Sequence, residues 1–252
     1  MLERFNVIGC AIVKTTMDEA INSVCQRVES KMGGYVCFTN VHASVMAGND
    51  ASFMSIVNDS FMSLPDGKPV YWVGRLLGNK GIEQIPGPDF FEKLLAHKGA
   101  PVLKHYVYGG KPEIIEMLVE KLKDRYSSID IVGMESPPFR QMSDEEMEMA
   151  IERINSTSPD IVWIGLGAPK QENWMSDHWQ QLKPAVLLGV GAAFDFHADA
   201  VKRAPIWMQK LGLEWFHRLM QEPDRLWKRY LYTNTVFLWR VIKQFINRKI
   251  KC

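Results

Sequence analysis

The sequence predicts an α/β fold with a doubly wound, mostly parallel sheet. Short apolar segments alternate along the chain with amphipathic segments of ten to fifteen residues, which is the pattern of strands and helices in such sheets. Two apolar segments end in Gly-x-Gly, at 165–167 and 189–191. Ligands of open α/β sheets bind outside the carboxyl ends of the strands. These two turns therefore predict a binding crevice at that edge of the sheet.

Six apolar segments have the length and composition of strands. They are residues 5–13, 35–39, 102–108, 129–133, 161–164 and 186–190. The segment at 161–164 is uniformly apolar, which indicates a buried strand. It leads directly into the first Gly-x-Gly turn and a polar helix start.

The segments between the strands carry the signals of helices. Thr16 and Glu19 stand in capping-box positions before one helix, and Ser143 and Glu146 do so before another. We expect helices at about 17–31, 41–46, 51–62, 90–97, 114–126, 144–155 and from 170 onward.

The glycine turns lack the spacing of the common nucleotide motifs. The turn at 165–167 is followed by Lys170 where the dinucleotide fingerprint has a third glycine, and the turn at 189–191 is followed by Phe194. Gly109-Gly110-Lys111 lacks the length of a P-loop and a following Ser or Thr. A standard dinucleotide or triphosphate site is therefore disfavoured.

The helix expected from Lys170 onward suits a different ligand chemistry. Its free N–H groups favour an anion. Gln171 can both donate and accept hydrogen bonds, so its amide suits a base or a sugar hydroxyl. The alternative is that Gln171 caps the helix or faces solvent.

Two other polar positions follow apolar segments. Thr39 and Asn40 either line the crevice or cap the next helix, and residue chemistry alone favours capping. Asp66 lies in Pro65-Asp66-Gly67, which forms a turn by its own chemistry. Because residues 69–77 are mostly apolar, Asp66 would lie at the mouth of a buried region, where a carboxylate can act as a general base.

Charge divides the chain into an acidic body and a basic tail. Residues 201–252 hold twelve Lys/Arg against three Asp/Glu, whereas residues 1–200 hold eighteen against twenty-six. We expect a core at 1–202 and a basic, amphipathic appendage at 203–252 with an anionic partner. Aromatic and aliphatic residues beside Lys and Arg in 206–252 favour the interface of an anionic membrane. A basic helix packed on the protein's own surface is the alternative, and nucleic acid is disfavoured because no recognised motif is present.

The remaining composition excludes several classes. The four cysteines show neither metal-ligand spacing nor a disulfide pattern, which favours a reducing cytosol and predicts no metal site. The first residues lack the regions of a signal peptide. No window of about 18 uncharged apolar residues exists, so we expect no membrane-spanning helix.

A set of short motifs, in this order and spacing, resembles the WecG/TagA/CpsF family of glycosyltransferases. The resemblance covers nearly the whole chain. The matching motifs are Thr39-Asn40, Pro65-Asp66-Gly67, Pro86-Gly87-x-Asp89, Tyr108-Gly109-Gly110-Lys111-Pro112, Gly165-x-Gly167-Ala168-Pro169-Lys170-Gln171-Glu172, Gly189-Val190-Gly191-Ala192-Ala193-Phe194-Asp195, Arg203-Ala204-Pro205 and Gly212-Leu213-Glu214-Trp215.

The resemblance implies a Rossmann-like enzyme of bacterial cell-surface polysaccharide assembly. It implies inverting, metal-independent and cofactor-free transfer of a hexose or N-acetylhexosamine, such as N-acetylmannosamine, from a UDP-sugar donor. The implied acceptor is a sugar linked to polyprenyl diphosphate, and the implied location is peripheral, on the cytoplasmic inner face of the plasma membrane. The resemblance leaves open whether the protein forms a homo-oligomer. The alternative is a non-catalytic nucleotide-sugar-binding protein of the same fold, and a Rossmann-type methyltransferase is disfavoured because the segment at 5–13 ends in no Gly-rich loop.

By the same resemblance, Asp66 is the catalytic base. The other implied residues bind substrate or border the nucleotide, and the basic tail brings its arginines over the site. They are Thr39, Asn40, Gln84, Gly165, Gly167, Lys170, Gln171, Gly189, Gly191, Asp195, Arg203, Arg218 and Arg225.

The chain departs from the family pattern at three positions. Gln84 stands where an arginine is frequent, which removes a fixed positive charge. Asp199 stands where glycine is common, so the loop before Arg203 is expected to differ. Lys228, followed by Arg229, stands for a third arginine of the tail and keeps the charge without the bidentate fork.

Overall fold

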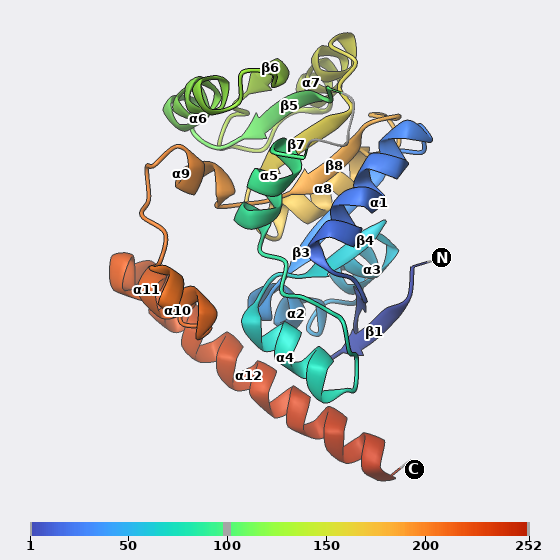
Figure 1. Cartoon of the computed structure of the whole chain (residues 1–252), viewed down its shortest axis with the longest axis vertical. Coiled ribbons are helices and arrows are strands. Elements are labelled where there is room, and N and C mark those ends of the chain that lie inside the picture. Colours follow the sequence, from blue (N-terminus) through green and yellow to red (C-terminus); the bar gives the residue numbers. More distant parts are fainter. Residues whose placement is uncertain (1, 98–101, 251–252) are drawn as a thin grey trace.

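The computed structural model describes residues 2–97 and 102–250, which build a six-stranded sheet covered by helices (Figure 1). The strand order is β4-β3-β8-β7-β5-β6, and every pairing in this sheet is parallel. The strands are β3 (Gly34–Thr39), β4 (Met62–Pro65), β5 (Lys104–Gly109), β6 (Asp130–Glu135), β7 (Ile161–Gly165) and β8 (Val186–Gly189). The predicted doubly wound α/β class is confirmed.

Helices cover both faces of the sheet because successive residues of its central strands are buried on opposite sides. In β3, Val36 and Phe38 belong to one apolar core, and Tyr35 and Cys37 belong to the other. The first core is closed by α1 (Met17–Glu29), α5 (Gly87–Leu95), α6 (Pro112–Arg125) and α9 (Ala193–His197). The second core is closed by α7 (Asp144–Ser156) and α8 (Lys170–His178).

Local sequence signals set several helix ends as predicted. The capping boxes of Thr16 with Glu19 and of Ser143 with Glu146 are both formed, and they start α1 and α7. The predicted helix start at Lys170 is also confirmed.

The first predicted strand is wrong. Residues 5–13 form an antiparallel hairpin of β1 (Arg4–Val7) and β2 (Cys10–Val13), outside the main sheet. Ile8 and Gly9 both adopt positive φ, at 46° and 103°, which is the geometry of a tight two-residue hairpin turn. An isoleucine at the first turn position hides this signal, since β-branched residues rarely adopt positive φ.

The helix predicted at 51–62 is too long. α3 (Ala51–Asp59) ends three residues earlier, and Met62 to Pro65 form β4 at the edge of the sheet. Four residues are too few to show a strand period in sequence, whereas pairing with β3 fixes them. The helices α2 (Val41–Ala47) and α4 (Lys68–Leu76) flank this edge.

The basic tail forms α10 (Ile206–Lys210), α11 (Glu214–Gln221) and the long α12 (Pro223–Ile250), which runs diagonally below the core in Figure 1. The second half of α12 is docked on the core. Phe237 and Val241 are buried in a third apolar cluster with residues of the hairpin. Gln244 accepts from the Ile8 N–H and donates to the Asn6 carbonyl oxygen, both at 2.8 Å. The division into a core (1–202) and an appendage (203–252) stays a prediction.

Candidate active site

Four neighbouring strands end at one edge of the sheet, and most of the predicted site residues follow these ends. Asp66 follows β4, and Asn40 follows β3. The turn at 189–191 ends β8, and the turn at 165–167 ends β7. Because the strand order is β4-β3-β8-β7, these four turns are successive neighbours along the edge. Residues separated by more than a hundred positions in sequence are thereby brought to one edge of the sheet.

The carboxylate of Asp66 is held by two hydrogen bonds. Asn40 Nδ2 donates to Oδ2 at 3.2 Å, and the Gly87 backbone N–H donates to Oδ1 at 3.3 Å. The Asp66 main chain is fixed as well, since its N–H reaches the Leu64 carbonyl oxygen at 2.9 Å and the Thr39 carbonyl oxygen at 3.2 Å. Both carboxylate oxygens are therefore oriented before any ligand binds.

Burial raises the pKa of the Asp66 carboxyl to about 7. The hydrogen bond from Asn40 opposes this change, the charge of Glu214 adds to it, and Gly87 and Arg203 also oppose it. The Asp66 residue as a whole is half-buried. A carboxyl whose pKa lies near neutral pH is a stronger proton acceptor than an ordinary aspartate and is still substantially ionised.

Asn40 caps the next helix, which is one of the two roles that the sequence left open, and its predicted place in the crevice stays a prediction. Its Oδ1 caps α2 by accepting from the Ala43 N–H at 3.1 Å, while its Nδ2 binds Asp66. Thr39 is buried, and its Oγ1 lies 2.7 Å from the Oγ of Ser63 on β4. Thr39 thus contacts the neighbouring strand, and its predicted substrate role stays a prediction.

Gln84 lies beside Asp66, because its Nε2 donates to the Asp66 carbonyl oxygen at 2.8 Å. It lines a cavity of about 460 Å³ between the first turn of α5 and the tail helices, together with Lys68, Arg203 and Glu214. The neutral amide at this position braces the main chain of the turn without adding a positive charge.

Gly87 is a site residue that sequence reasoning did not single out, although the motif at 86–89 contains it. It donates to Asp66 and opens α5. A Cβ at this position would lie 3.3 Å from the Val190 carbonyl oxygen. The backbone of Gly87 therefore packs tightly against the β8–α9 turn, and it connects the group around Asp66 with the turn at 189–191.

The glycines of the predicted crevice have two distinct uses. Gly167 and Gly191 adopt positive φ, at 75° and 55°, which lets both turns bend sharply. Gly165 and Gly189 instead allow close packing, since a Cβ at either would overlap a side chain, Phe194 at 2.3 Å or Met175 at 2.6 Å. The predicted role of these glycines beside a nucleotide stays a prediction.

Gln171 is buried at the first turn of α8, and Lys170 beside it is exposed. Gln171 Nε2 donates to the Gly189 carbonyl oxygen at 2.9 Å and to Glu172 Oε1 at 3.0 Å. Gln171 is therefore neither a helix cap nor a solvent-facing residue. Its side chain contacts the end of β8, and its main chain N–H donates to the Gly167 carbonyl oxygen in the turn after β7.

Asp195 forms a second charged group at the same edge. Burial raises the pKa of its carboxyl, and the charges of Arg218, Arg225 and Lys111 partly oppose that change. The guanidinium of Arg218 lies over the ring of Phe196, with its central carbon 5.8 Å from the ring centroid. Arg225 forms an ion pair with Glu222 at 2.7 Å. The structure thus brings the two predicted tail arginines close to the core at α9.

Arg203 is an anchor for the tail. Its guanidinium makes a bidentate ion pair with Asp89 of α5, and its Nε donates to Glu214 at 2.9 Å. Burial by itself lowers the pKa of Arg203, but the hydrogen bonds that Arg203 donates to Asp89 and the negative charges of Asp89 and Glu214 raise it above its ordinary value. This arginine holds the start of α11 against α5.

Asp199, which stands where the family commonly has glycine, adopts a backbone conformation that suits glycine. It adopts a positive φ of 56°, a conformation that glycine takes readily and that aspartate also tolerates. Its exposed carboxylate pairs with Lys121. The expectation that the loop would differ here stays untested, but the aspartate keeps the backbone geometry that a glycine would favour.

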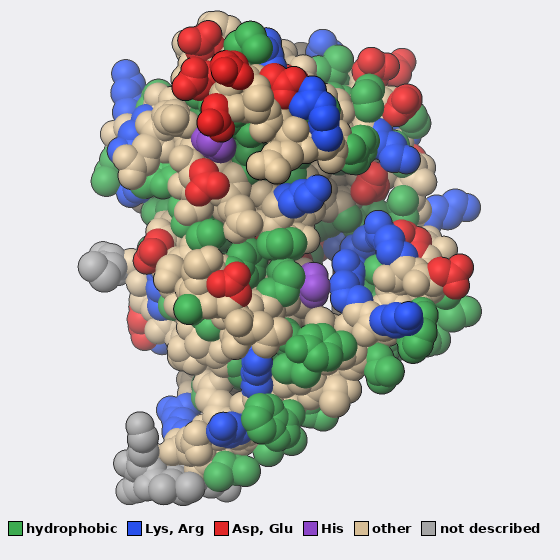
Figure 2. Space-filling model, turned by 180° about the vertical axis from the view of Figure 1, so that it is seen from behind, with side chains coloured by type: hydrophobic (Ala, Val, Ile, Leu, Met, Phe, Trp, Pro, Cys, Tyr) green, Lys and Arg blue, Asp and Glu red, His purple; other side chains and the backbone are tan. Residues whose placement is uncertain are grey.

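The tail exposes many large apolar side chains next to basic ones. Trp207, Trp227 and Trp239 are each about half exposed or more, at 60%, 49% and 60%. Figure 2 shows hydrophobic side chains interspersed with Lys and Arg along the lower part of the molecule, where α12 runs in Figure 1. None of the helices in residues 2–97 and 102–250 is long and apolar enough to cross a membrane.

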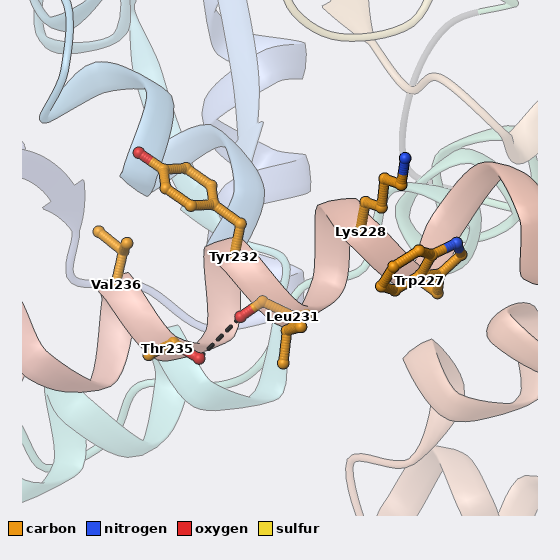
Figure 3. Close-up of a pocket in the computed structure, with 6 residues that line it drawn as sticks. All are labelled: Trp227, Lys228, Leu231, Tyr232, Thr235 and Val236. Carbon is orange, nitrogen blue, oxygen red and sulfur yellow. Dashed lines mark hydrogen bonds between the residues drawn. The ribbon is translucent and has the colours of Figure 1, made fainter.

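A shallow apolar groove of about 420 Å³ lies on the first half of α12 (Figure 3). Its six lining residues come from successive turns of this one helix, and they are Trp227, Lys228, Leu231, Tyr232, Thr235 and Val236. The groove contains none of the predicted catalytic or nucleotide-binding residues. Lys228, the substitute for an expected arginine, is turned toward Trp227, with its Nζ 5.4 Å from the ring centroid.

Within the described part of the chain, no three His, Cys, Asp or Glu side chains cluster closely enough to hold a metal ion. The cysteines described, Cys10, Cys25 and Cys37, are buried and unbridged.

Comparison with known proteins gives two matches. The sequence profile described as "Glycosyl transferase WecG/TagA/CpsF family" matches residues 5–251. A protein of Bacillus subtilis (strain 168) is 32% identical over 222 residues, which is 88% of this chain and 84% of that protein. It is described as "N-acetylglucosaminyldiphosphoundecaprenol N-acetyl-beta-D-mannosaminyltransferase".

Proposed function

Since this chain belongs to the WecG/TagA/CpsF family and is therefore a glycosyltransferase, we propose that it transfers a hexose or N-acetylhexosamine from a UDP-sugar to a polyprenyl-diphosphate-linked sugar. The name of the Bacillus subtilis relative supports a polyprenyl-diphosphate-sugar acceptor and favours N-acetylmannosamine as the sugar transferred. The observation that carries the proposal is the oriented carboxylate of Asp66, whose pKa burial raises to about 7, at the carboxyl edge of the sheet.

Asp66 acts as the general base of the reaction. An acceptor hydroxyl approaches the carboxylate, and its proton passes to an Asp66 oxygen as the hydroxyl oxygen attacks the anomeric carbon. The bond from that carbon to the diphosphate breaks on the opposite face, so UDP leaves and the configuration inverts. Asn40 and Gly87 hold the carboxylate in place throughout, which lowers the entropic cost of aligning the base with the acceptor.

The departing diphosphate gains negative charge, which Lys111, Arg218 and Arg225 stabilise. All three act electrostatically on Asp195, so they lie near the carboxyl edge of the sheet. Lys170, at the free N-terminus of α8, adds a further positive group at this edge. In this scheme the tail completes a site that the core supplies only in part.

The exposed aromatic and basic residues of 206–252 attach the enzyme to an anionic membrane surface, on the inner face of the plasma membrane. An acceptor with a polyprenyl chain is confined to a membrane, so its sugar becomes accessible only to an enzyme held at that surface. Trp207 lies on α10 and Arg218 on α11, whereas α12 carries Arg225 together with Trp227 and Trp239. Membrane contact and the diphosphate site are therefore coupled through one segment.

The test is turnover with purified components. The native chain is incubated with a UDP-sugar and a polyprenyl-diphosphate-linked N-acetylglucosamine, and the reaction is repeated with Asp66→Asn. We expect turnover by the native chain and a loss of about two to four orders of magnitude in kcat for the variant, with an unchanged circular dichroism spectrum. Unchanged turnover by the folded variant would exclude Asp66 as the base. A native chain that binds UDP-sugars without turnover would instead indicate a nucleotide-sugar-binding protein.

A further inference from the structure

The side-chain amide of Gln171 is held in one orientation. Its Nε2 donates to the Gly189 carbonyl oxygen and to Glu172 Oε1, at 2.9 and 3.0 Å. A backbone carbonyl oxygen can only accept, so an exchange of the amide nitrogen and oxygen would place two acceptors against each other. The amide oxygen of Gln171 therefore faces away from both partners.

That oxygen, Gln171 Oε1, is buried and has no hydrogen-bond partner in the part of the chain that the structure describes. It faces Gly191, where a Cβ would lie 3.5 Å from it. Gly191 has no side chain that could supply a donor to this oxygen. A buried acceptor without a donor is costly. The unpartnered oxygen of Gln171 is explained if a bound ligand supplies its hydrogen-bond donor.

Glu172 is the second group that holds this orientation, beside the Gly189 carbonyl oxygen. It is 2% exposed, and its Oε1 is engaged by Gln171. Its other oxygen, Oε2, has no partner among residues 2–97 and 102–250. A buried carboxyl with so few hydrogen bonds is a poor source of stability. Burial also raises its pKa to about 6, although the hydrogen bond from Gln171 favours the charged form.

We propose that Glu172 is a positioning residue that holds the Gln171 oxygen toward the Gly191 turn, so that the crevice selects an N–H or O–H donor group on the nucleotide-sugar. This inference rests on the proposed function, because it takes the crevice as the UDP-sugar site. Glu172 acts through Gln171 and does not itself touch the substrate.

The test separates the acceptor oxygen of Glu172 from its charge. Glu172→Gln retains an oxygen that accepts from Gln171, whereas Glu172→Leu removes it at similar volume. We expect Glu172→Leu to raise KM for the UDP-sugar about tenfold with kcat nearly unchanged, and Glu172→Gln to stay close to the native enzyme. Should Glu172→Leu not fold, Glu172→Met removes the same acceptor with a more adaptable side chain.

Two results would overturn the inference. One is an unchanged KM in a folded Glu172→Leu or Glu172→Met enzyme, which would leave Glu172 a purely structural role. The other is an increase in KM for Glu172→Gln as large as that for Glu172→Leu, which would show that the charge of Glu172 causes the effect and not its acceptor oxygen. A double variant that combines Glu172→Leu with Gln171→Met adds a coupling test. Its KM should match that of Gln171→Met alone. If the two single-variant increases in KM instead multiply in the double variant, Glu172 does not act through Gln171.

Calorimetry with UDP alone locates the donor group. If it belongs to the uracil base or the ribose, Glu172→Leu weakens UDP binding by the same factor as it raises KM. If it belongs to the transferred sugar, UDP binding stays native and only KM changes. A native chain that neither binds nor turns over a UDP-sugar overturns the proposed function and this inference with it. A native chain that does, with variants indistinguishable from it, overturns the inference alone.

Discussion

Asn40 links the pH dependence of activity to the geometry around Asp66. A base must be ionised to take a proton, so kcat/KM decreases about tenfold per pH unit below the pKa of the base. Burial raises the pKa of Asp66 to about 7, and the hydrogen bond from Asn40 limits that increase. We expect the native enzyme to be half active near pH 7 and to retain roughly a tenth of its activity at pH 6.

The substitution Asn40→Ser removes the amide donor but keeps an oxygen that can cap α2. A hydrogen bond to a charged group contributes about 1.5–3 kcal/mol. Because the Asn40–Asp66 bond is long, at 3.2 Å, and Asp66 is only half-buried, we take the lower limit. At about 1.4 kcal/mol per pKa unit, the acid limb should move upward by about one pH unit. The free energy of unfolding should change by less than about 1 kcal/mol, since serine is also a good N-cap.

The assay is kcat/KM between about pH 5.5 and pH 9, with thermal unfolding of each variant as the control. Gln84→Arg should shift the acid limb of kcat/KM in the opposite direction, to lower pH. The reason is that a guanidinium beside the Asp66 turn favours the charged carboxylate. A folded Asn40→Ser enzyme whose acid limb coincides with the native limb would refute the assignment of that limb to Asp66.

Two further predictions concern the crevice and the tail. Gly109→Ala should lower the free energy of unfolding by about 3 kcal/mol or more in chemical denaturation, because the new Cβ would lie 2.7 Å from the Gly165 backbone at a φ of 114°. The control is Gly78→Ala, which has a φ of 91° and open space around the new Cβ, and it should cost only about 1 kcal/mol. Equal losses in the two variants would contradict the steric argument. Replacement of Trp227 and Trp239 by Asn should weaken sedimentation with anionic vesicles at least tenfold while the melting temperature stays native, since both side chains are about half exposed or more. Neutral vesicles are the control, and native-like binding by the folded double variant would exclude this face as the membrane contact. Deletion of the tail is a less selective test, because Phe237 and Val241 belong to an apolar core.

Much of the central fold could be predicted because its signals are local. Capping boxes at Thr16 and Ser143, and the apolar run at 161–164 followed by Gly-x-Gly, each specify an element without reference to the rest of the chain. The prediction of a single strand at residues 5–13 failed because a strand and a hairpin share the same apolar composition. The positive φ values of Ile8 and Gly9 distinguish them, and those conformations belong to the folded backbone.

The candidate site divides in the same way. The sequence by itself determined the chemical types: a carboxylate in a turn, an amide at a helix start, glycines after strands and a basic tail. Tertiary structure alone decided that Asp66 and Asn40 are hydrogen-bonded across the ends of β4 and β3, and that the Gly87 N–H completes the cradle. It likewise decided that Arg203 is held by Asp89 and Glu214. The physical reason is that burial and long-range contacts, which set the pKa of Asp66 and the orientation of Gln171, arise only when strands distant in sequence lie side by side.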